Sequence, residues 1–508
     1  MLELVHRVLW GPWLMALFLA AGAVYTVRSR CFQVRGLMTW WRATVGSLFR
    51  EGAPEEASGP GAGARDADRR TLQGAQIKTA CTALAATVGT GNIVGVATAI
   101  TAGGPGALFW MWASAALGMM TAYGEVYLGI KSRLREQDGR VLCGPFVYLE
   151  RLAKRPLLAG LYALFALLCS LGMGSMVQAN SLADTVAYAF RLPKLLTAAG
   201  LGLLTAAVIR GGREKIGQAA ARLVPFSAGL YIFFALAVIC FCRETLPVVL
   251  QDIFREAFCL RAAAGGAAGT GISQAMRYGL ARGVFSNEAG LGSMAILHGD
   301  SPGEDPGLQG MWAMFEVFFD TILVCTLTGL ALLCGIQKAG GDLGLQGAAL
   351  TSWCFALYLG DLGGYVLSLS LVLFAFATII AWYYLGSQAL AYLEEKRGRW
   401  KVRRRTAGRR TDRGMAGDPG RGADDRKGRE EPGETGLSRV YRWAYLVSVV
   451  TGCLAGMGKV WLLSDIFNGL MALPNLAALF LLAGQVRFPA AQGLAGQVPT
   501  SATEGRRG

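Results

Sequence analysis

The stretch that decides the fold is TVGTGNIVG, residues 87–95, which lies within a segment from Thr79 to Gly124 that contains no charged residue. A run this long and apolar is typical of helices that cross a lipid bilayer, which need about 20 apolar residues each. AGGPG at residues 102–106 predicts a tight turn between two such helices. Because glycine disfavours helix, the three glycines near the middle of the first helix predict an interruption there.

These glycines have an alternative explanation. Gly91 and Gly95 form a G-x-x-x-G step, which allows two membrane helices to pack closely. A second interruption changes this interpretation: RGVFSNEAGLGS, residues 282–293, again combines glycines and polar side chains in an apolar setting. Residues 265–271, also rich in glycine, are a competing position for the second break.

The composition is that of a polytopic, all-α membrane protein. The 508 residues are 53% hydrophobic and 16% charged, whereas soluble proteins average about 25% charged residues. Two histidines, no C-x-x-C pair and no P-loop motif leave little material for an enzyme, a metal centre or ATP binding, so we expect no cofactor. The short apolar segment 345–359 is assigned to an extracellular loop helix. Eleven membrane spans are predicted, near residues 8–27, 79–101, 107–130, 157–190, 195–209, 222–242, 266–297, 309–335, 363–393, 440–457 and 461–485.

The net charge of +15 would suggest a nucleic-acid partner in a soluble protein, but its placement gives another explanation. Arg28, Arg30, Arg35 and Arg42 follow the first span, and basic residues then concentrate in alternate loops. By the positive-inside rule this predicts a plasma-membrane protein with its N-terminus outside and its C-terminus in the cytoplasm. No nucleic-acid partner is expected.

Two polar segments are predicted to be disordered. Residues 51–70 are rich in glycine, alanine, proline and charge, and residues 396–439 are strongly basic. The basic segment has two explanations: contact with anionic membrane lipid, or a solvated linker that sets the topology. The first keeps a lipid-interacting signalling protein as an alternative from a different functional class.

The two interrupted helices begin two halves of five spans each, once the N-terminal span is set aside. Paired interruptions at matching positions indicate an inverted-repeat secondary transporter, in which unwound backbone binds the substrate and the coupling ion. The predicted organisation is an extra N-terminal helix with the start of a cytoplasmic loop (1–50), a polar loop (51–78), the first repeat (79–243), the start of the second repeat (244–395), the basic insertion (396–439), the last two helices (440–485) and a cytoplasmic tail (486–508).

The chain resembles the alanine or glycine:cation symporter family, the sodium:alanine symporters, in five stretches: TVGTGNIVGVATAITAGGPGALFWMW, RGVFSNEAGLGS, DTILVCTLTG, LFAFATIIAWYYLG and SDIFNGLMALPN. The resemblance covers about residues 70–490, apart from the basic insertion. It implies a five-plus-five inverted-repeat fold of the amino-acid/sodium symporter type. It also implies Na⁺ as the coupling ion and a small neutral amino acid, alanine or glycine, as the substrate.

The resemblance further implies which residues contact the substrate. Gln178 has an interhelical hydrogen bond as its alternative role. Trp382, which would cap a small substrate, could instead be a lipid-facing or interfacial aromatic. The residues expected at the substrate are Thr87, Gly89, Thr90, Gly91, Asn92, Gln178, Phe285, Ser286, Gly290, Gly292 and Trp382.

Sodium requires hard oxygen ligands, and the resemblance places them beside the first interruption. The carbonyl oxygens of Ala85 and Val88 and the hydroxyl of Thr378 are the expected ligands. Ala377 stands where the family pattern has a serine, so one expected hydroxyl is missing and another oxygen would have to replace it.

Four acids lie within predicted spans, namely Glu125, Glu288, Glu316 and Asp320. A charge at membrane depth is costly and marks function by default. Glu125, six residues before Lys131, is expected to form a structural or gating ion pair rather than to carry protons. Asp320 is a candidate for helix pairing or an ion path. A proton-coupled or exchange carrier that uses Glu288 or Asp320 is the alternative within transport.

Overall fold

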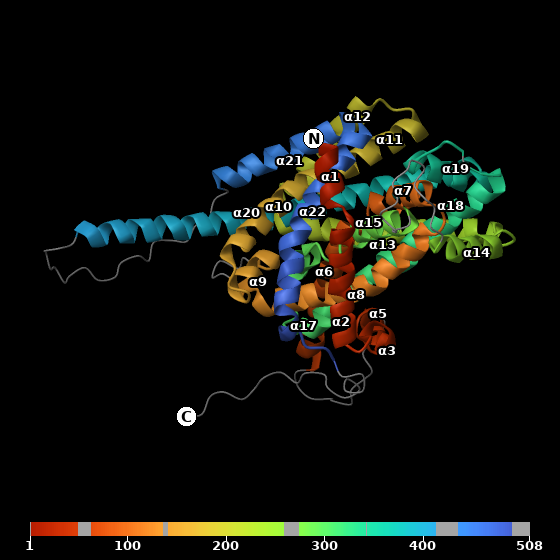
Figure 1. Cartoon of the computed structure of the whole chain (residues 1–508). Coiled ribbons are helices and arrows are strands. Elements are labelled where there is room, and N and C mark those ends of the chain that lie inside the picture. Colours follow the sequence, from red (N-terminus) through yellow and green to blue (C-terminus); the bar gives the residue numbers. More distant parts are fainter. Residues whose placement is uncertain are drawn as a thin grey trace.

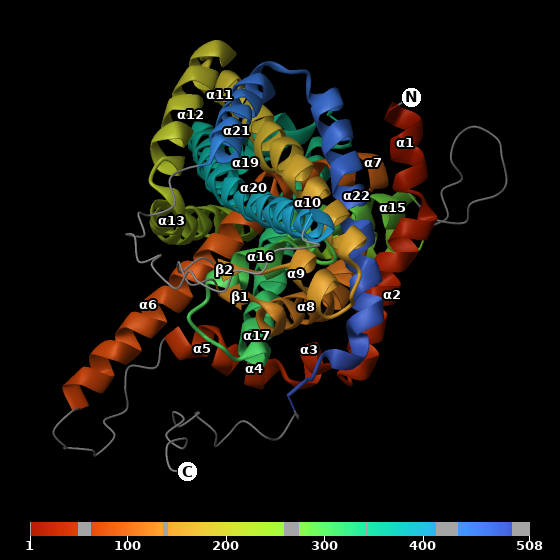
Figure 2. The ribbon, with the colours of Figure 1, turned by 90° about the vertical axis from the view of Figure 1, so that its left-hand side faces the viewer.

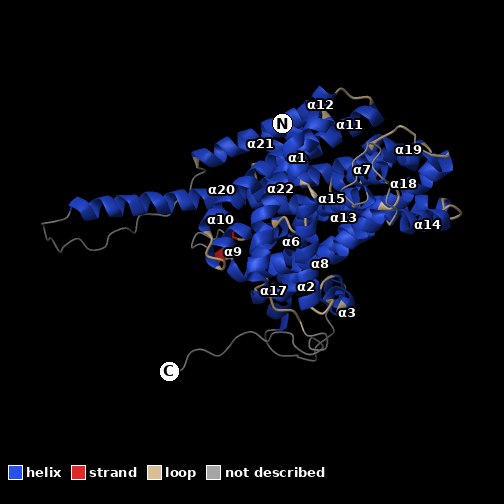
Figure 3. Ribbon diagram, viewed as in Figure 1, coloured by secondary structure: helices blue, strands red, loops and turns tan. Residues whose placement is uncertain are grey.

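The computed structural model describes residues 2–48, 62–135, 141–258, 274–341, 343–412 and 435–489. These residues are almost entirely helical, and their one sheet is the antiparallel pair β1 (Leu134–Arg135) and β2 (Val141–Leu142) (Figure 3). The predicted all-α fold class is confirmed. In chain order the helices are α1 (Leu2–Leu9), α2 (Pro12–Arg28), α3 (Phe32–Arg35), α4 (Leu37–Ala43), α5 (Val45–Leu48), α6 (Ala62–Thr87), η1 (Thr90–Asn92), α7 (Val94–Gly103), α8 (Ala107–Ser132), α9 (Pro145–Arg151), α10 (Pro156–Leu171), η2 (Gly172–Val177), α11 (Gln178–Phe190), α12 (Lys194–Ile209), α13 (Gly212–Phe241), α14 (Leu246–Ala257), α15 (Gln274–Asn287), α16 (Ser293–Leu297), η3 (His298–Asp300), α17 (Pro306–Val317), η4 (Phe318–Cys325), α18 (Thr326–Ala339), α19 (Gly347–Leu359), α20 (Asp361–Asp412), α21 (Gly436–Leu454), α22 (Met457–Leu482) and η5 (Ala483–Gln485).

Among the described residues, six helical segments are long and apolar enough to cross a membrane, and a seventh consists of two helices bent by 56°. A multi-pass membrane chain is therefore confirmed. The count of eleven spans and the five-plus-five repeat stay predictions, because α8, α12, α15 and α21 occupy predicted spans without belonging to this set. The six segments are Leu2–Arg28, Pro156–Phe190, Gly212–Phe241, Pro306–Ala339, Asp361–Arg397 and Gly458–Gln485, and the bent pair is Gly74–Thr87 with Thr90–Gly103.

Two segments predicted to lack structure are partly helical. Helix α6 begins at Ala62, inside the predicted polar loop, and its N-terminal part projects from the bundle (Figure 2). Helix α20 continues to Asp412, which corrects the prediction of disorder for the first part of the basic insertion (Figure 1). The first extension is rich in alanine and arginine, and the second is rich in arginine and lysine; these good helix formers prolong an existing helix at little cost. Residues 49–61 and 413–434 lie outside the described residues. A helix within residues 345–359 is confirmed as α19, whereas its extracellular position stays a prediction.

The two interrupted helices lie inside the bundle, where other helices cover them. α15 packs against both α7 and α8, and α6 packs against α13 and α20. Every residue from Thr79 to Val96 is buried. Large apolar side chains on the outer helices remain exposed, as expected for a surface that contacts lipid rather than water; they include Leu157, Leu203, Phe233, Phe241 and Trp443.

Candidate functional site

The first interruption separates α6 from α7 at the position that the glycines predict. α6 ends at Thr87, a 3₁₀ turn forms η1, and the Gly89 N–H donates to Asn92 Oδ1 at 2.9 Å. A β-carbon added at Gly89 would lie 2.7 Å from Thr378 Oγ1, so the backbone approaches the facing helix as closely as glycine allows. A β-carbon at Gly95 would have no neighbour within 4 Å, so close helix packing does not explain that glycine.

The predicted sodium ligands come together beside this interruption. Thr378 Oγ1 lies 2.8 Å from the Ala85 carbonyl oxygen and 3.5 Å from the Val88 carbonyl oxygen. The same hydroxyl lies 3.0 Å from the Phe374 carbonyl oxygen in its own helix. The break frees the carbonyl groups at the end of α6, and α20 supplies the hydroxyl, so three hard oxygen atoms converge on one buried point.

Gln178 occupies the space beside the first interruption. Its Oε1 accepts from the Thr90 N–H at 3.1 Å and from Thr90 Oγ1 at 2.9 Å, and its Nε2 donates to the Met173 carbonyl at 3.3 Å. Gln178 follows the π-helical turn η2, a widening of the helix that often marks functional sites. The structure therefore shows the interhelical hydrogen bond, whereas a contact between Gln178 and a substrate stays a prediction.

The second interruption falls at residues 288–292, between α15 and α16. Glu288 has φ +55°, and Gly290 and Gly292 have φ +99° and +81°. The left-handed backbone suits glycine but is uncommon for glutamate, so Glu288 is held in a strained turn. A second break within residues 282–293 is confirmed, whereas the competing position at 265–271 lies outside the described residues.

Two of the residues predicted in the second broken helix face the first one. The Phe285 ring lies 3.3 Å from the β-carbon position of Gly91, and Ser286 Oγ donates to Asp320 Oδ2 at 2.7 Å. Gly290 and Gly292 lie elsewhere: their β-carbon positions face Phe18 of α2 and Pro145 of α9, respectively. The structure does not bring these two glycines together with the other predicted substrate residues.

Trp382 is fully buried in α20, which excludes the lipid-facing alternative. Its Nε1 donates to Glu288 Oε1 at 3.2 Å, and its side chain fills the space left by Gly174 in η2. Trp382 therefore contacts the second interruption as well as the π-helical turn that precedes Gln178.

Asp320 links both interrupted helices, a role that the sequence indicated only as helix pairing or an ion path. Its fully buried carboxylate accepts from Asn92 Nδ2 at 2.6 Å, from Ser286 Oγ at 2.7 Å and from Thr321 Oγ1 at 2.8 Å. Asp320 lies in η4, a second π-helical segment. Three donors satisfy the oxygens of this one carboxylate, and two of them, Asn92 and Ser286, come from the two interrupted helices.

The expected ion pair between Glu125 and Lys131 is wrong. Glu125 is fully buried and accepts from Asn475 Nδ2 at 2.6 Å, whereas Lys131 donates to the Gln485 carbonyl at 3.3 Å near the surface. Asn475 Nδ2 also donates to the Gly290 carbonyl at 2.9 Å, which connects Glu125 to the second interruption. Sequence analysis missed Asn475, because an asparagine in an apolar helix indicates a polar contact but not its partner.

Two cavities, of about 460 and 190 Å³, open on the side predicted to be cytoplasmic, and both are lined by Arg213 and Tyr384. Beside the smaller cavity, the Lys78 ammonium donates to Glu214 at 2.5 Å. The opposite side is closed by a buried ion pair between Arg282 and Asp465 (3.1 Å).

The closed side also carries aromatic packing. The Arg282 guanidinium lies 5.0 Å from the Trp461 ring centroid and 5.4 Å from that of Phe285, and these two rings stack at 5.0 Å. Phe285 thus packs against Arg282 and Trp461 on the closed side, and it also lies beside Gly91 of the first interruption.

The chain is similar in sequence to known transporters over most of its length. The sequence matches the Sodium:alanine symporter family over residues 1–407 and 432–491. An uncharacterized transporter of Haemophilus influenzae is 36% identical over 94% of this chain and 92% of its own length. The sodium/alanine symporter AgcS of Methanococcus maripaludis is 35% identical over 95% of this chain and 94% of its own length. The probable sodium/glutamine symporter GlnT of Bacillus subtilis is 32% identical over 94% of this chain and 87% of its own length. The chain belongs to the sodium:alanine symporter family and is a sodium-coupled amino-acid transporter of the membrane.

Proposed function

We propose that this protein imports alanine or glycine together with Na⁺ by alternating access. The observation that carries the proposal is the convergence of Thr378 Oγ1 with the Ala85 and Val88 carbonyl oxygens beside the interruption of α6. Hard cations prefer such neutral and anionic oxygen ligands, and unwound helices supply them in transporters of this kind.

The substrate carboxylate is proposed to bind the N–H groups of Thr90 and Gly91. These groups begin η1 and lie at the positive end of the following helix. The Thr90 N–H is held by Gln178 Oε1 at 3.1 Å, so substrate binding would exchange an amide oxygen for a carboxylate oxygen. This exchange costs little, because one acceptor replaces another.

The residues that surround the proposed substrate site favour a small and neutral substrate. Phe285 and Trp382 are buried, and backbone at Gly91 and Gly174 approaches them closely. The nearby Asp320 carboxylate is already bound by three donors, which leaves it poorly placed to pair with a charged substrate side chain. The relatives AgcS and GlnT, a sodium/alanine and a probable sodium/glutamine symporter by name, both support a neutral amino acid.

Cavities on the predicted cytoplasmic side and the closed Arg282–Asp465 pair opposite them support an inward-facing arrangement. With the N-terminus outside and the C-terminus in the cytoplasm, these cavities face the cytoplasm. Na⁺ that passes into them therefore enters the cell down its gradient. Each Na⁺ that crosses 100 mV contributes about 2.3 kcal/mol, equivalent to roughly 50-fold accumulation of the substrate.

Uptake of radiolabelled alanine and glycine into proteoliposomes tests the proposal. We expect uptake with an inward Na⁺ gradient and little uptake when K⁺ replaces Na⁺. Thr378→Val should need a much higher Na⁺ concentration for uptake, whereas Thr378→Ser should keep the wild-type requirement, because only serine retains the hydroxyl. Uptake that is indifferent to Na⁺ but follows a proton gradient would replace the proposal with the proton-coupled alternative.

The basic segment provides a second test, against a function in lipid signalling. We propose that residues 413–434 are dispensable for transport, because the described sodium and substrate residues lie in α6, η1, α11, α15 and α20. Deletion of 413–434 should leave Na⁺-driven uptake intact. If the deletion variant still binds anionic vesicles but no longer takes up the substrate, residues 413–434 are needed for transport and this assignment is wrong.

A further inference from the structure

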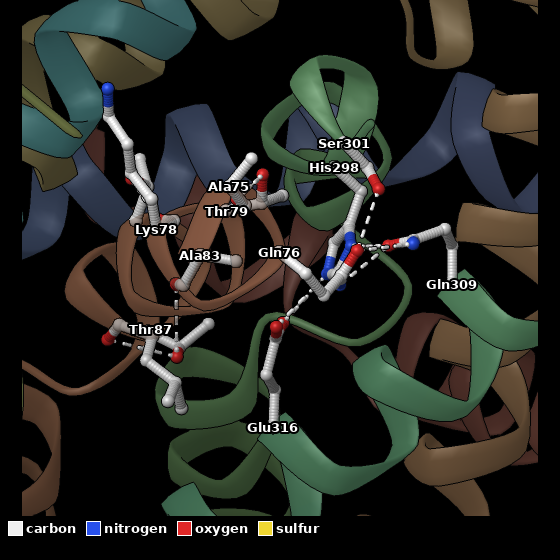
Figure 4. Close-up of polar contacts among 12 residues, drawn as sticks. Ala75, Gln76, Lys78, Thr79, Ala83, Thr87, His298, Ser301, Gln309 and Glu316 are labelled. Carbon is white, nitrogen blue, oxygen red and sulfur yellow. Dashed lines mark hydrogen bonds and ion pairs between the residues drawn. The ribbon is translucent and has the colours of Figure 1, made fainter. Parts of the chain in front are cut away.

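A second group of titratable side chains lies outside the sodium and substrate residues. His298 in η3 and Glu316 in α17 are both 0% exposed, and His298 Nε2 lies 3.0 Å from Glu316 Oε1 and 3.2 Å from Oε2 (Figure 4). A buried carboxylate needs a partner, and here one ring N–H faces both of its oxygens.

The other ring nitrogen fixes the protonation of the pair. His298 Nδ1 lies 3.1 Å from Gln309 Oε1, which also accepts from Gln76 Nε2 at 3.2 Å. Since Gln309 Nε2 is used to donate to Gln76 Oε1 at 2.8 Å, Nδ1 must be the donor to Gln309 Oε1. Nδ1 therefore carries hydrogen, and the 3.0 Å contact between Nε2 and Glu316 Oε1 requires one more proton between the two groups. We assign this proton to Nε2, because the nitrogen faces both carboxylate oxygens, at 3.0 and 3.2 Å.

The same network can close without that proton. If both amides turn over, Gln309 Nε2 donates to Nδ1, and Gln76 donates to Ser301 Oγ instead of accepting from it at the observed 3.0 Å. The imidazole is then neutral, and Glu316 carries an uncompensated negative charge in a buried place. That charge destabilises the packing of α6, η3 and α17 around the pair. It favours any arrangement in which water reaches the carboxylate.

Gln76 connects the pair to the helix that carries the first interruption. It lies in α6, while Gln309 and Glu316 lie in α17 and His298 follows the inner half of the second broken helix (Figure 4). Proton binding therefore joins three elements: α6, η3 and α17. Loss of the proton weakens the packing between them.

Water can reach this neighbourhood from one side. The cavity of about 190 Å³ is lined by Ala75, which precedes Gln76, and by Leu297, which precedes His298. Thr79 and Asp300 line the same cavity. A proton from this side has a short path to the pair.

The ionisable groups around the pair do not compensate its charge directly. From α6, the Cys81 thiol lies close enough to interact electrostatically with Glu316. After β2, burial raises the pKa of the Cys143 thiol to about 12, so this thiol is neutral. After α8, Arg133 donates to the Ser301 carbonyl at 2.9 Å. In the loop itself, Asp300 is held by Arg213 and Tyr384.

We propose that His298 and Glu316 form a proton-binding site, distinct from the sodium and substrate sites, whose proton holds α6 and η3 against α17. The site takes one proton from the side of the cavity lined by Ala75 and Leu297. When that side becomes alkaline, the proton leaves and the inward-facing packing of α6 loosens. Proton binding by this pair does not depend on the proposed transport function, whereas its effect on uptake rests on that function.

Proton binding can be measured without transport, because the chain contains two histidines. In His6→Gln protein labelled with ¹⁵N-histidine, purified without a histidine tag and placed in nanodiscs, the remaining imidazole signal belongs to His298. Between about pH 5 and pH 9 we expect two protonated ring nitrogens at neutral pH and one at alkaline pH. Glu316→Gln should give a neutral ring at neutral pH. A His298 ring that stays neutral over this whole pH range in the protein that retains Glu316 would overturn the proposal.

Uptake into proteoliposomes of one orientation tests the consequence. Wild-type Na⁺-driven uptake should change several-fold as the pH on the cavity side rises, whereas Glu316→Gln should give a flat profile. Glu316→Asp, which keeps the carboxylate, is the matched control and should keep a pH-dependent profile. A folded Glu316→Gln variant with an unchanged pH profile would also overturn the proposal, while absent uptake beside a titrating His298 would refute only the transport function.

Discussion

Thr378 Oγ1 lies 2.8 Å from the Ala85 carbonyl oxygen, although 293 residues separate the two in the chain. This contact joins α20 to the end of α6 at the first interruption. It exists because α6 stops at Thr87 and no longer uses its last carbonyl groups within the helix.

Removal of the Thr378 hydroxyl should weaken sodium binding. A polar contact to a charged group contributes about 1.5–3 kcal/mol, so the Na⁺ concentration for half-maximal uptake should rise roughly 10- to 100-fold in Thr378→Val. Thr378→Ser is the matched control. Equal Na⁺ dependence in the two variants would show that this hydroxyl is not a ligand.

A hydroxyl at position 377 should strengthen sodium binding. Ala377 is fully buried beside Thr378, where a serine would add a second hydroxyl. In Ala377→Ser we expect the half-maximal Na⁺ concentration to fall several-fold, with a similar maximal rate. Thermal unfolding with and without Na⁺ gives an independent measurement, since a tighter site raises the stabilisation by Na⁺. A fall in Na⁺ stabilisation would contradict the expectation.

Alanine at Gly89 should abolish transport, because its β-carbon would lie 2.7 Å from Thr378 Oγ1 and 3.1 Å from Gln178 Oε1. Gly95→Ala is the control, since its β-carbon meets nothing within 4 Å. That change should keep transport and stabilise α7 by up to about 1 kcal/mol. Uptake by both variants would mean that the first interruption tolerates displacement.

Asp320→Asn should destabilise the protein and stop uptake. The asparagine amide would face donors from Asn92, Ser286 and Thr321 with an N–H₂ group in place of an acceptor. Each unsatisfied buried donor costs about 1–3 kcal/mol. Ser286→Ala removes one donor but keeps the carboxylate, so its melting temperature should fall less. The reverse order of melting temperatures would show that the Asp320 carboxylate does not join the two interrupted helices.

The Arg282–Asp465 pair should control access from the closed side. Asp465→Asn leaves Arg282 buried without its charge partner, so we expect a shift toward arrangements open on that side. A cysteine placed at Ser286 should then react faster with a membrane-impermeant thiol reagent added there. The exchange Arg282→Asp with Asp465→Arg should partly restore slow labelling. Unchanged labelling in Asp465→Asn would show that the pair does not close the site.

The sequence alone determined the class of the protein and the position of its two interruptions. Long charge-free segments have no stable alternative to membrane helices, and glycine-rich runs within them weaken the helix wherever they fall. It also grouped Ala85, Val88 and Thr378, but only through resemblance to a family.

Only the tertiary structure decided the partners of the buried polar groups. Glu125 bonds Asn475 instead of Lys131, Asp320 joins both interruptions, and His298 faces Glu316. These contacts join residues on different helices, and their geometry depends on π-helical turns and crossing positions that no local pattern encodes. A buried acid in the sequence predicts that a partner exists, whereas the packing of the helices selects which one.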